Sequence, residues 1–144
     1  LLQKFLAETF TVSTKIDMHL RKPGSQAGLI VMGLDYACIR ILQQDDNYYL
    51  EYAICIGAED NKEEISTEKV LINQKQIFLQ VKIDKEAICH FKYSFSGNDF
   101  IEIGKAFKAR EGKWIGAKVG LYCLASNDSE KQNYVDVDWF RITK

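Results

Sequence analysis

The strongest constraint on the fold is an alternation of apolar and polar side chains with a period of two residues. It is clearest over residues 10–18 and 77–83, where almost every second residue is large and apolar. Because successive side chains of a β-strand point to opposite faces, this pattern predicts strands with one buried face. Similar segments rich in aromatic and β-branched residues are also predicted to be strands: residues 27–32, 37–43, 48–56, 87–94, 118–124 and 134–142.

Clusters of turn-forming residues separate the predicted strands, and no segment shows a sustained helical stripe. The clusters lie at residues 22–25, 44–47, 57–61, 96–99 and 126–133. Strands therefore follow one another about every 8 to 15 residues, which is typical of a β-sandwich or barrel. Gly97 predicts a hairpin turn, since glycine adopts a positive φ at little cost. Because the sequence contains no linker, residues 1–144 are predicted to form a single all-β sandwich domain.

The charge of the chain is balanced, with 19 basic and 20 acidic residues and a formal net charge of -1. No net field would steer the domain onto nucleic acid or an anionic membrane surface, so neither partner is predicted. The acidic run at residues 59–64 is predicted to be a solvated loop. The longest strongly apolar stretch, residues 27–32, is too short to span a bilayer. The N-terminus shows no export signal pattern, so cytoplasm, periplasm and secretion all stay open.

The four cysteines occur singly and form no C-x-x-C pair, so a structural zinc site is not predicted. Each lies among apolar or aromatic neighbours, where a free cysteine behaves as a small buried hydrophobe. Free thiols are therefore predicted in preference to disulfides. The residues are Cys38, Cys55, Cys89 and Cys123. No motif for any other metal or cofactor is complete.

The sharpest catalytic hypothesis concerns Asp136 and Asp138. Two residues apart on a strand, they would project from one face about 7 Å apart, within the spacing of an inverting glycosidase pair. Alternating acids are also common on a solvated strand face, with Val135, Val137 and Trp139 then taking the inner face. We interpret the pair as solvated residues. A structural calcium site is an alternative, but it needs six or more oxygen ligands that the sequence does not show.

Other catalytic patterns are incomplete. No serine or cysteine lies in a nucleophile motif, and neither His19 nor His90 has an evident carboxylate partner. Gly112, Gly116 and Gly120 recur at intervals of four, yet no helix follows them, so they are predicted to mark bends or close backbone approaches instead of a phosphate site. No catalytic residue is assigned.

Aromatic residues are the best candidates for ligand contact, because tryptophan and tyrosine offer flat faces to sugar rings. Most aromatics of a sandwich belong to its core, and packing is the favoured interpretation for six of them: Tyr36, Tyr48, Tyr49, Tyr52, Tyr122 and Trp139. Trp114 differs, because it lies in a segment flanked by glycine and lysine that is typical of a loop edge. Trp114 is the first candidate for carbohydrate contact, with Tyr36 retained as a second.

Several ordered segments carry a family resemblance: residues 27–33, 35–37, 91–100, 112–123 and 136–141. Together they resemble the C-terminal domain of glycoside hydrolase family 43 enzymes, of the β-xylosidase and arabinofuranosidase type. The resemblance extends from Phe10 to Ile142. It implies an antiparallel, jelly-roll type, concanavalin A-like (lectin-like) sandwich that packs against a five-bladed β-propeller.

The resemblance also implies where catalysis takes place. In that family the propeller holds three catalytic carboxylates, and nothing in this chain replaces them. The chain itself is therefore expected to be non-catalytic, and its parent is expected to hydrolyse pentose-containing oligosaccharides. In related enzymes an aromatic residue of the sandwich closes one wall around the terminal sugar. The matching segment here begins with Trp114 and Ile115.

The chain departs from the family at its start, where related domains carry a further N-terminal stretch. Residues 1–5 also begin without a turn signal, as though a strand had been entered partway. The expectation is a C-terminal fragment that lacks its first strands and the upstream propeller. An exposed strand edge would then favour strand exchange or a homo-oligomer.

Three functions stay open at this point. The first is a non-catalytic accessory domain that packs on the propeller and helps to close its substrate pocket. The second is an autonomous carbohydrate-binding module for xylan or arabinan. The third is a structural or protein-interaction sandwich, since such folds host many unrelated functions. The sugar specificity would depend mainly on propeller residues.

Overall fold

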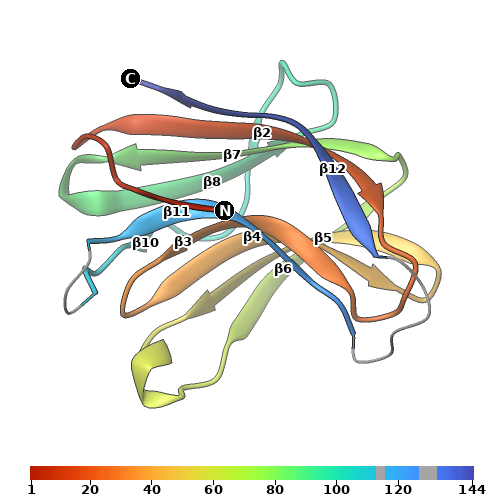
Figure 1. Ribbon diagram of the computed structural model, residues 1–144, viewed down its shortest axis with the longest axis horizontal. Helices are drawn as coiled ribbons and strands as arrows, with labels where there is room; N and C mark the ends of the chain where they lie inside the picture. Colours follow the sequence, from red (N-terminus) through yellow and green to blue (C-terminus); the bar gives the residue numbers. More distant parts are fainter. Residues whose placement is uncertain (113–115, 127–132) are drawn as a thin grey trace.

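The computed structural model describes residues 1–112, 116–126 and 133–144. Two antiparallel β-sheets pack face to face in the described chain (Figure 1). Sheet A has the strand order β1-β11-β3-β4-β5-β6, and sheet B has the order β10-β8-β7-β2-β12 with β9 paired to β8. This arrangement confirms the predicted antiparallel all-β sandwich.

The strands of sheet A are β1 (Leu2–Lys4), β3 (Gln26–Met32), β4 (Tyr36–Gln44), β5 (Asn47–Cys55), β6 (Ile65–Ile72) and β11 (Lys118–Leu124). Those of sheet B are β2 (Phe10–His19), β7 (Gln76–Asp84), β8 (Ile88–Ser94), β9 (Ile101–Glu102), β10 (Phe107–Lys108) and β12 (Tyr134–Thr143). Two 3-10 turns, η1 (Ala58–Asp60) and η2 (Lys85–Ala87), complete the regular elements that the structure describes.

The core lies between the two sheets and follows the predicted alternation. Every second residue of β2, from Phe10 to Met18, is buried, and so is every second residue of β7, from Ile77 to Ile83. Burying a side chain of this size contributes about 1.5–3 kcal/mol, so these two central strands supply much of the driving force for folding. Their pairing, with Thr14 opposite Leu79, keeps both inner faces in register.

The two edge strands of sheet A carried little sequence signal: β6 was not predicted as a strand, and for β1 the sequence indicated only that residues 1–5 begin as though partway through one. Most side chains of β6 are exposed, because it is the edge strand of sheet A, so it carries no apolar alternation. β1 forms the opposite edge and pairs with β11, where Leu2 lies opposite Gly120. A Cβ at Gly120 would lie 1.9 Å from the Leu1 carbonyl oxygen, which confirms a close backbone approach at this glycine. Strand exchange at these edges stays a prediction.

The edge strand of sheet B, β12, differs from its prediction. The register of β12 against β2 shifts between Val137 and Trp139, so Trp139 lies opposite Lys15 on the outer face. Beyond the shift, Phe140 and Ile142 pack against the core instead. The predicted inward placement of Trp139 is therefore wrong, because a β-bulge adds a residue and reverses the faces that follow it.

The cysteines and turns largely match expectation. All four cysteines are free thiols, of which three are buried, whereas Cys123 is exposed on β11. Gly97 has a φ of 86° in the turn between β8 and β9, as the predicted hairpin requires. Its hydrogen atom faces the ring of Phe78, where a Cβ would come within 2.9 Å.

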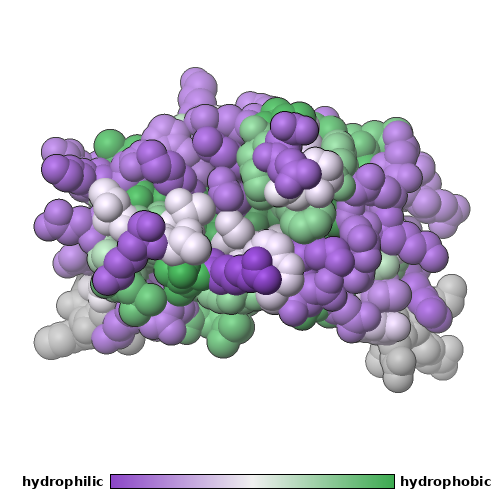
Figure 2. Space-filling view, turned by 90° about the horizontal axis from the view of Figure 1, so that it is seen from above, coloured by the Kyte–Doolittle hydropathy of each residue, from purple (hydrophilic) through white to green (hydrophobic). Residues whose placement is uncertain are grey.

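The exterior of sheet B is mixed in character. Seen from above, on the side where β2 and β7 lie in Figure 1, the surface is mostly hydrophilic with separate hydrophobic patches (Figure 2). Over the described ranges, no helix has the length and apolar character needed to cross a bilayer.

Candidate functional site

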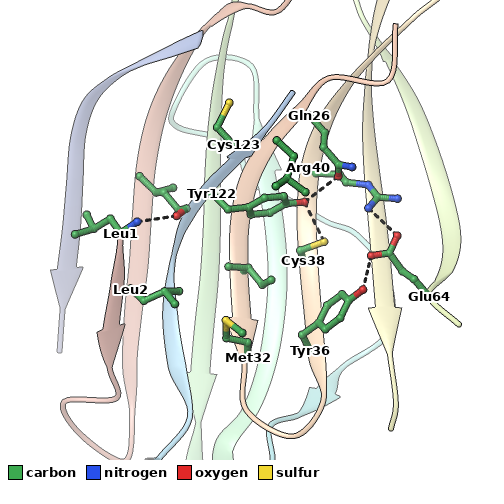
Figure 3. Close-up of a pocket in the computed structure, with 13 residues that line it drawn as sticks. Leu1, Leu2, Gln26, Met32, Tyr36, Cys38, Arg40, Glu64, Tyr122 and Cys123 are labelled. Carbon is green, nitrogen blue, oxygen red and sulfur yellow. Dashed lines mark hydrogen bonds and ion pairs between the residues drawn. The ribbon is translucent and has the colours of Figure 1, made fainter. Parts of the chain in front are cut away.

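A cleft crosses the outer face of sheet A, which is the face turned away from sheet B. Its volume is about 580 Å³, within the range of ligand sites. Apolar side chains from residues 1–2, β3 and β11 line one part, and polar side chains from β3, β4, β11 and the residue before β6 line the other (Figure 3). The polar members are Gln26, Tyr36, Arg40, Glu64 and Tyr122.

Arg40 lies between two carboxylates in this cleft. Its Nε donates to Glu51 Oε2 at 2.7 Å, and its two terminal nitrogens lie 2.6 Å from Glu51 Oε2 and 2.7 Å from Glu64 Oε1. The side chains of Arg40 and Glu51 are only 11% and 10% exposed. Burial opposes the charge on Arg40, but the hydrogen bonds with both carboxylates outweigh it and raise the pKa of the guanidinium.

Two tyrosines flank this ion pair. Tyr36 donates its hydroxyl to Glu64 Oε2 at 2.8 Å, and the Tyr122 hydroxyl lies 3.3 Å from Gln26 Oε1 and 3.5 Å from the Cys38 sulfur. Burial raises the pKa of both phenols. Both hydroxyls therefore stay neutral near pH 7 and act as hydrogen-bond donors and acceptors.

The strand geometry explains why these residues meet. Tyr36, Cys38 and Arg40 are alternate residues of β4 and so share its outer face. Glu51 lies directly opposite Arg40 on β5. Tyr122 lies opposite Gly28 on β3, so its ring crosses a position without a side chain and reaches towards Cys38, as Figure 3 shows.

A second feature lies at the end of the sandwich that carries the turn between β3 and β4. The carboxylate of Asp35, whose residue is 2% exposed, accepts hydrogen bonds from Arg110 Nε, from Arg110 Nη2 at 2.6 Å and from the Gly57 backbone N–H at 2.6 Å. These bonds, first of all those from Arg110, hold the pKa of Asp35 below its usual value despite burial. The pair ties the segment after β10 to the turn before β4.

Backbone hydrogen bonds fix the same segment on its other sides. Ala109 donates to the Ala87 carbonyl at 3.0 Å, and Phe5 donates to the Ala117 carbonyl at 3.1 Å. The chain between these contacts includes the predicted contact residues Trp114 and Ile115, which lie outside the described residues. The structure shows how the residues on either side of them are anchored.

The third predicted site residue, Tyr36, lines the cleft on sheet A. Sequence reasoning missed Arg40 and Glu51, which become partners only once β4 and β5 are paired in register. Residues 59–64 are exposed as predicted, yet Glu64 contacts Arg40 and Tyr36. Among the residues that the structure describes, no group of three or more histidine, cysteine or acidic side chains is arranged to hold a metal ion.

The acidic pair on β12 lies on the opposite sheet. Asp136 contacts His19 Nε2 at 3.2 Å, and Asp138 contacts Lys15 Nζ at 2.5 Å, with both carboxylates solvent-exposed. His90 Nδ1 likewise lies 3.0 Å from a carboxylate oxygen, that of Glu102. The expectation that the histidines lack carboxylate partners is therefore wrong, because the partners come from neighbouring strands and not from nearby sequence.

The sequence and fold of the chain are similar to those of known proteins. A family model described as the β-xylosidase C-terminal concanavalin A-like domain matches residues 1–143. A β-xylosidase of Formosa agariphila is 29% identical over 133 residues, which cover 92% of this chain and 21% of that protein.

Solved structures agree with the family match. A bifunctional GH43-CE protein of Bacteroides eggerthii matches with a TM-score of 0.86 at 25% identity, over 98% of this chain and 18% of its own. A xylan β-1,4-xylosidase of Bacillus halodurans C-125 matches with a TM-score of 0.80 at 18% identity, over 99% of this chain and 29% of its own.

These matches confirm the predicted concanavalin A-like fold. The chain spans about a fifth of the curated relative and less than a third of either solved chain. In these larger proteins the catalytic domain lies elsewhere. The chain belongs to the family of C-terminal concanavalin A-like domains of glycoside hydrolase family 43 β-xylosidases.

Proposed function

We propose that the chain is a non-catalytic accessory domain that packs on the catalytic propeller of its parent hydrolase and forms one wall of the substrate pocket. The wall would be the segment between Ala109 and Ala117, with Trp114 and Ile115 as its contact residues for the terminal pentose. Membership of a family named for β-xylosidases supports the class of substrate.

The observation that carries this proposal is the anchoring of that segment by Asp35 and Arg110. A buried carboxylate is costly unless it is paired and hydrogen-bonded, and Arg110 and the Gly57 N–H meet this need for Asp35. The same bonds hold the segment that leads to Trp114 against the turn before β4. A contact residue on a segment held at its base loses less conformational entropy when it meets a ligand.

The surface around the segment suits a partner domain. Residues on both sides of Trp114, namely Glu111 and Gly116, line one hollow of about 200 Å³ together with Phe5 and Ala87. Charged side chains, Lys4 and Glu111, line the hollow beside apolar ones, and contacts between domains of one chain are likewise more polar than obligate interfaces.

Replacement of Trp114 by alanine in the full-length parent enzyme tests the proposal. Loss of one pocket contact predicts a fall in kcat/KM of about 5- to 150-fold on xylobiose. The matched control is Trp139→Ala, because Trp139 lies on the outer face of sheet B, where its ring contacts Phe78 and Arg141. Unchanged kcat/KM in the Trp114 variant, or an equal fall in both variants, would refute the proposal that this segment forms a wall of the substrate pocket.

A further inference from the structure

We infer that the cleft on the outer face of sheet A is a binding site for a neutral oligosaccharide, separate from the pocket wall proposed above. Its described lining includes no residue of the segment between Ala109 and Ala117. The inference therefore goes beyond the accessory role and does not depend on it.

The cleft combines the two surfaces that a sugar chain needs. Three exposed leucines on its rim, Leu1, Leu2 and Leu124, offer apolar contact to the C–H faces of sugar rings. The rings of Tyr36 and Tyr122 enter it from β4 and β11 (Figure 3), and tyrosine provides a flat apolar face together with a polar edge.

The polar side of the cleft retains hydrogen-bonding capacity. A guanidinium has five N–H donors, and Glu51 and Glu64 use one on each of the three nitrogens of Arg40. The two N–H donors that remain belong to a side chain that lines the cleft together with Tyr122. Each oxygen of Glu64 accepts one hydrogen bond, from Arg40 or from Tyr36, and a carboxylate oxygen can accept a second. Vicinal hydroxyl groups match such paired donors and acceptors.

The charge of the cleft selects among sugars. Around Arg40 one guanidinium faces two carboxylates, and the pKa of each phenol is raised, so this end of the cleft carries a net negative charge near pH 7. The N-terminal ammonium of Leu1 lies at the opposite end of the cleft (Figure 3). Burying a second anion beside Glu64 would be repulsive in a partly desolvated site. A neutral xylo- or arabino-oligosaccharide therefore fits, whereas a chain bearing a uronic acid at this position is disfavoured.

Nuclear magnetic resonance titration of the ¹⁵N-labelled 144-residue chain tests the inference. The probes are xylotetraose, arabinotetraose and a xylotetraose that carries one glucuronic acid. We expect saturable shifts on β3, β4 and β11 with at least one neutral probe, and at least about fivefold weaker binding of the acidic probe. The absence of saturable shifts with both neutral probes at about 10 mM, or equal binding of the acidic probe, would overturn the inference.

Two variants and one control assign the site. Tyr36→Ala should weaken neutral binding by about tenfold or more, because it removes an aromatic face and the partner of Glu64. Glu64→Gln should reduce the discrimination against the acidic probe, since it removes the repelling charge. The control is Tyr49→Ala, because Tyr49 lies on β5 outside the cleft lining with Lys69 over its ring. Equal loss in the Tyr36 and Tyr49 variants, or unchanged discrimination in the Glu64 variant, would contradict the assignment.

Discussion

The ion pair in the cleft allows a stability prediction from the structure. Replacing Arg40 by methionine keeps most of the side-chain volume but leaves Glu51 without the guanidinium that neutralises it. Glu51 is 10% exposed in its side chain, and removing one partner of a buried pair costs about 3–5 kcal/mol. The Glu64 side chain is 29% exposed, so losing its contact with Arg40 costs only what a solvent-screened surface pair is worth, about 0.2–1 kcal/mol.

The free energy of unfolding of Arg40→Met should therefore fall by about 3–5 kcal/mol, a large part of the 5–15 kcal/mol typical of a domain. Urea denaturation at pH 7 measures it. The double variant Arg40→Met/Glu51→Leu should recover most of the loss, because an apolar pair replaces a buried ion pair at little cost. A loss below about 1 kcal/mol in the single variant, or no recovery in the double variant, would refute the reasoning.

Two further predictions concern the ion pair between Asp35 and Arg110 and the cysteine thiols. In Asp35→Asn, thermal unfolding at pH 7 should occur at a lower temperature than in the parent chain. Because the folded-state pKa of Asp35 is lowered, its stabilisation is present above the ordinary carboxyl pKa of about 4 and is lost as the pH falls through the folded-state value. The difference between the two chains should therefore shrink as the pH is lowered below about 4, and a difference that does not shrink would contradict the ion pair between Asp35 and Arg110. Burial raises the pKa of Cys89 to about 12, whereas Cys123 is exposed. Iodoacetamide at pH 8 should therefore modify Cys123 first, as mass spectrometry would show, and faster labelling of Cys89 would contradict its burial.

The sequence predicted the fold well where one strand face is buried. β2 and β7 show unbroken alternation because both are central strands of sheet B with a solvated outer face. β6 escaped prediction because an edge strand with mostly exposed side chains has no such pattern. The bulge in β12 leaves no local signal, since it depends on how Trp139 and Lys15 meet across two strands.

The candidate site was predicted only in part, because its residues meet through the pairing and order of strands. Tyr36 stood out by residue type, but its partner Glu64 lies just before β6, a strand that is not adjacent to β4 in sheet A. Asp35 and Arg110 are 75 residues apart, and nothing in either neighbourhood marks them as partners. Such pairs follow from sheet order, which the alternation of a single strand does not encode. The contact roles of Trp114 and Ile115 stay predictions.

The central claim is that the segment between Ala109 and Ala117 closes the substrate pocket of the parent hydrolase. A crystal structure of the full-length enzyme with xylobiose tests it most directly. The claim predicts the Trp114 side chain within about 4 Å of the terminal xylose, with Asp35 and Arg110 paired at the base of the segment. A structure in which the segment faces solvent, and the pocket is complete without it, would contradict the claim.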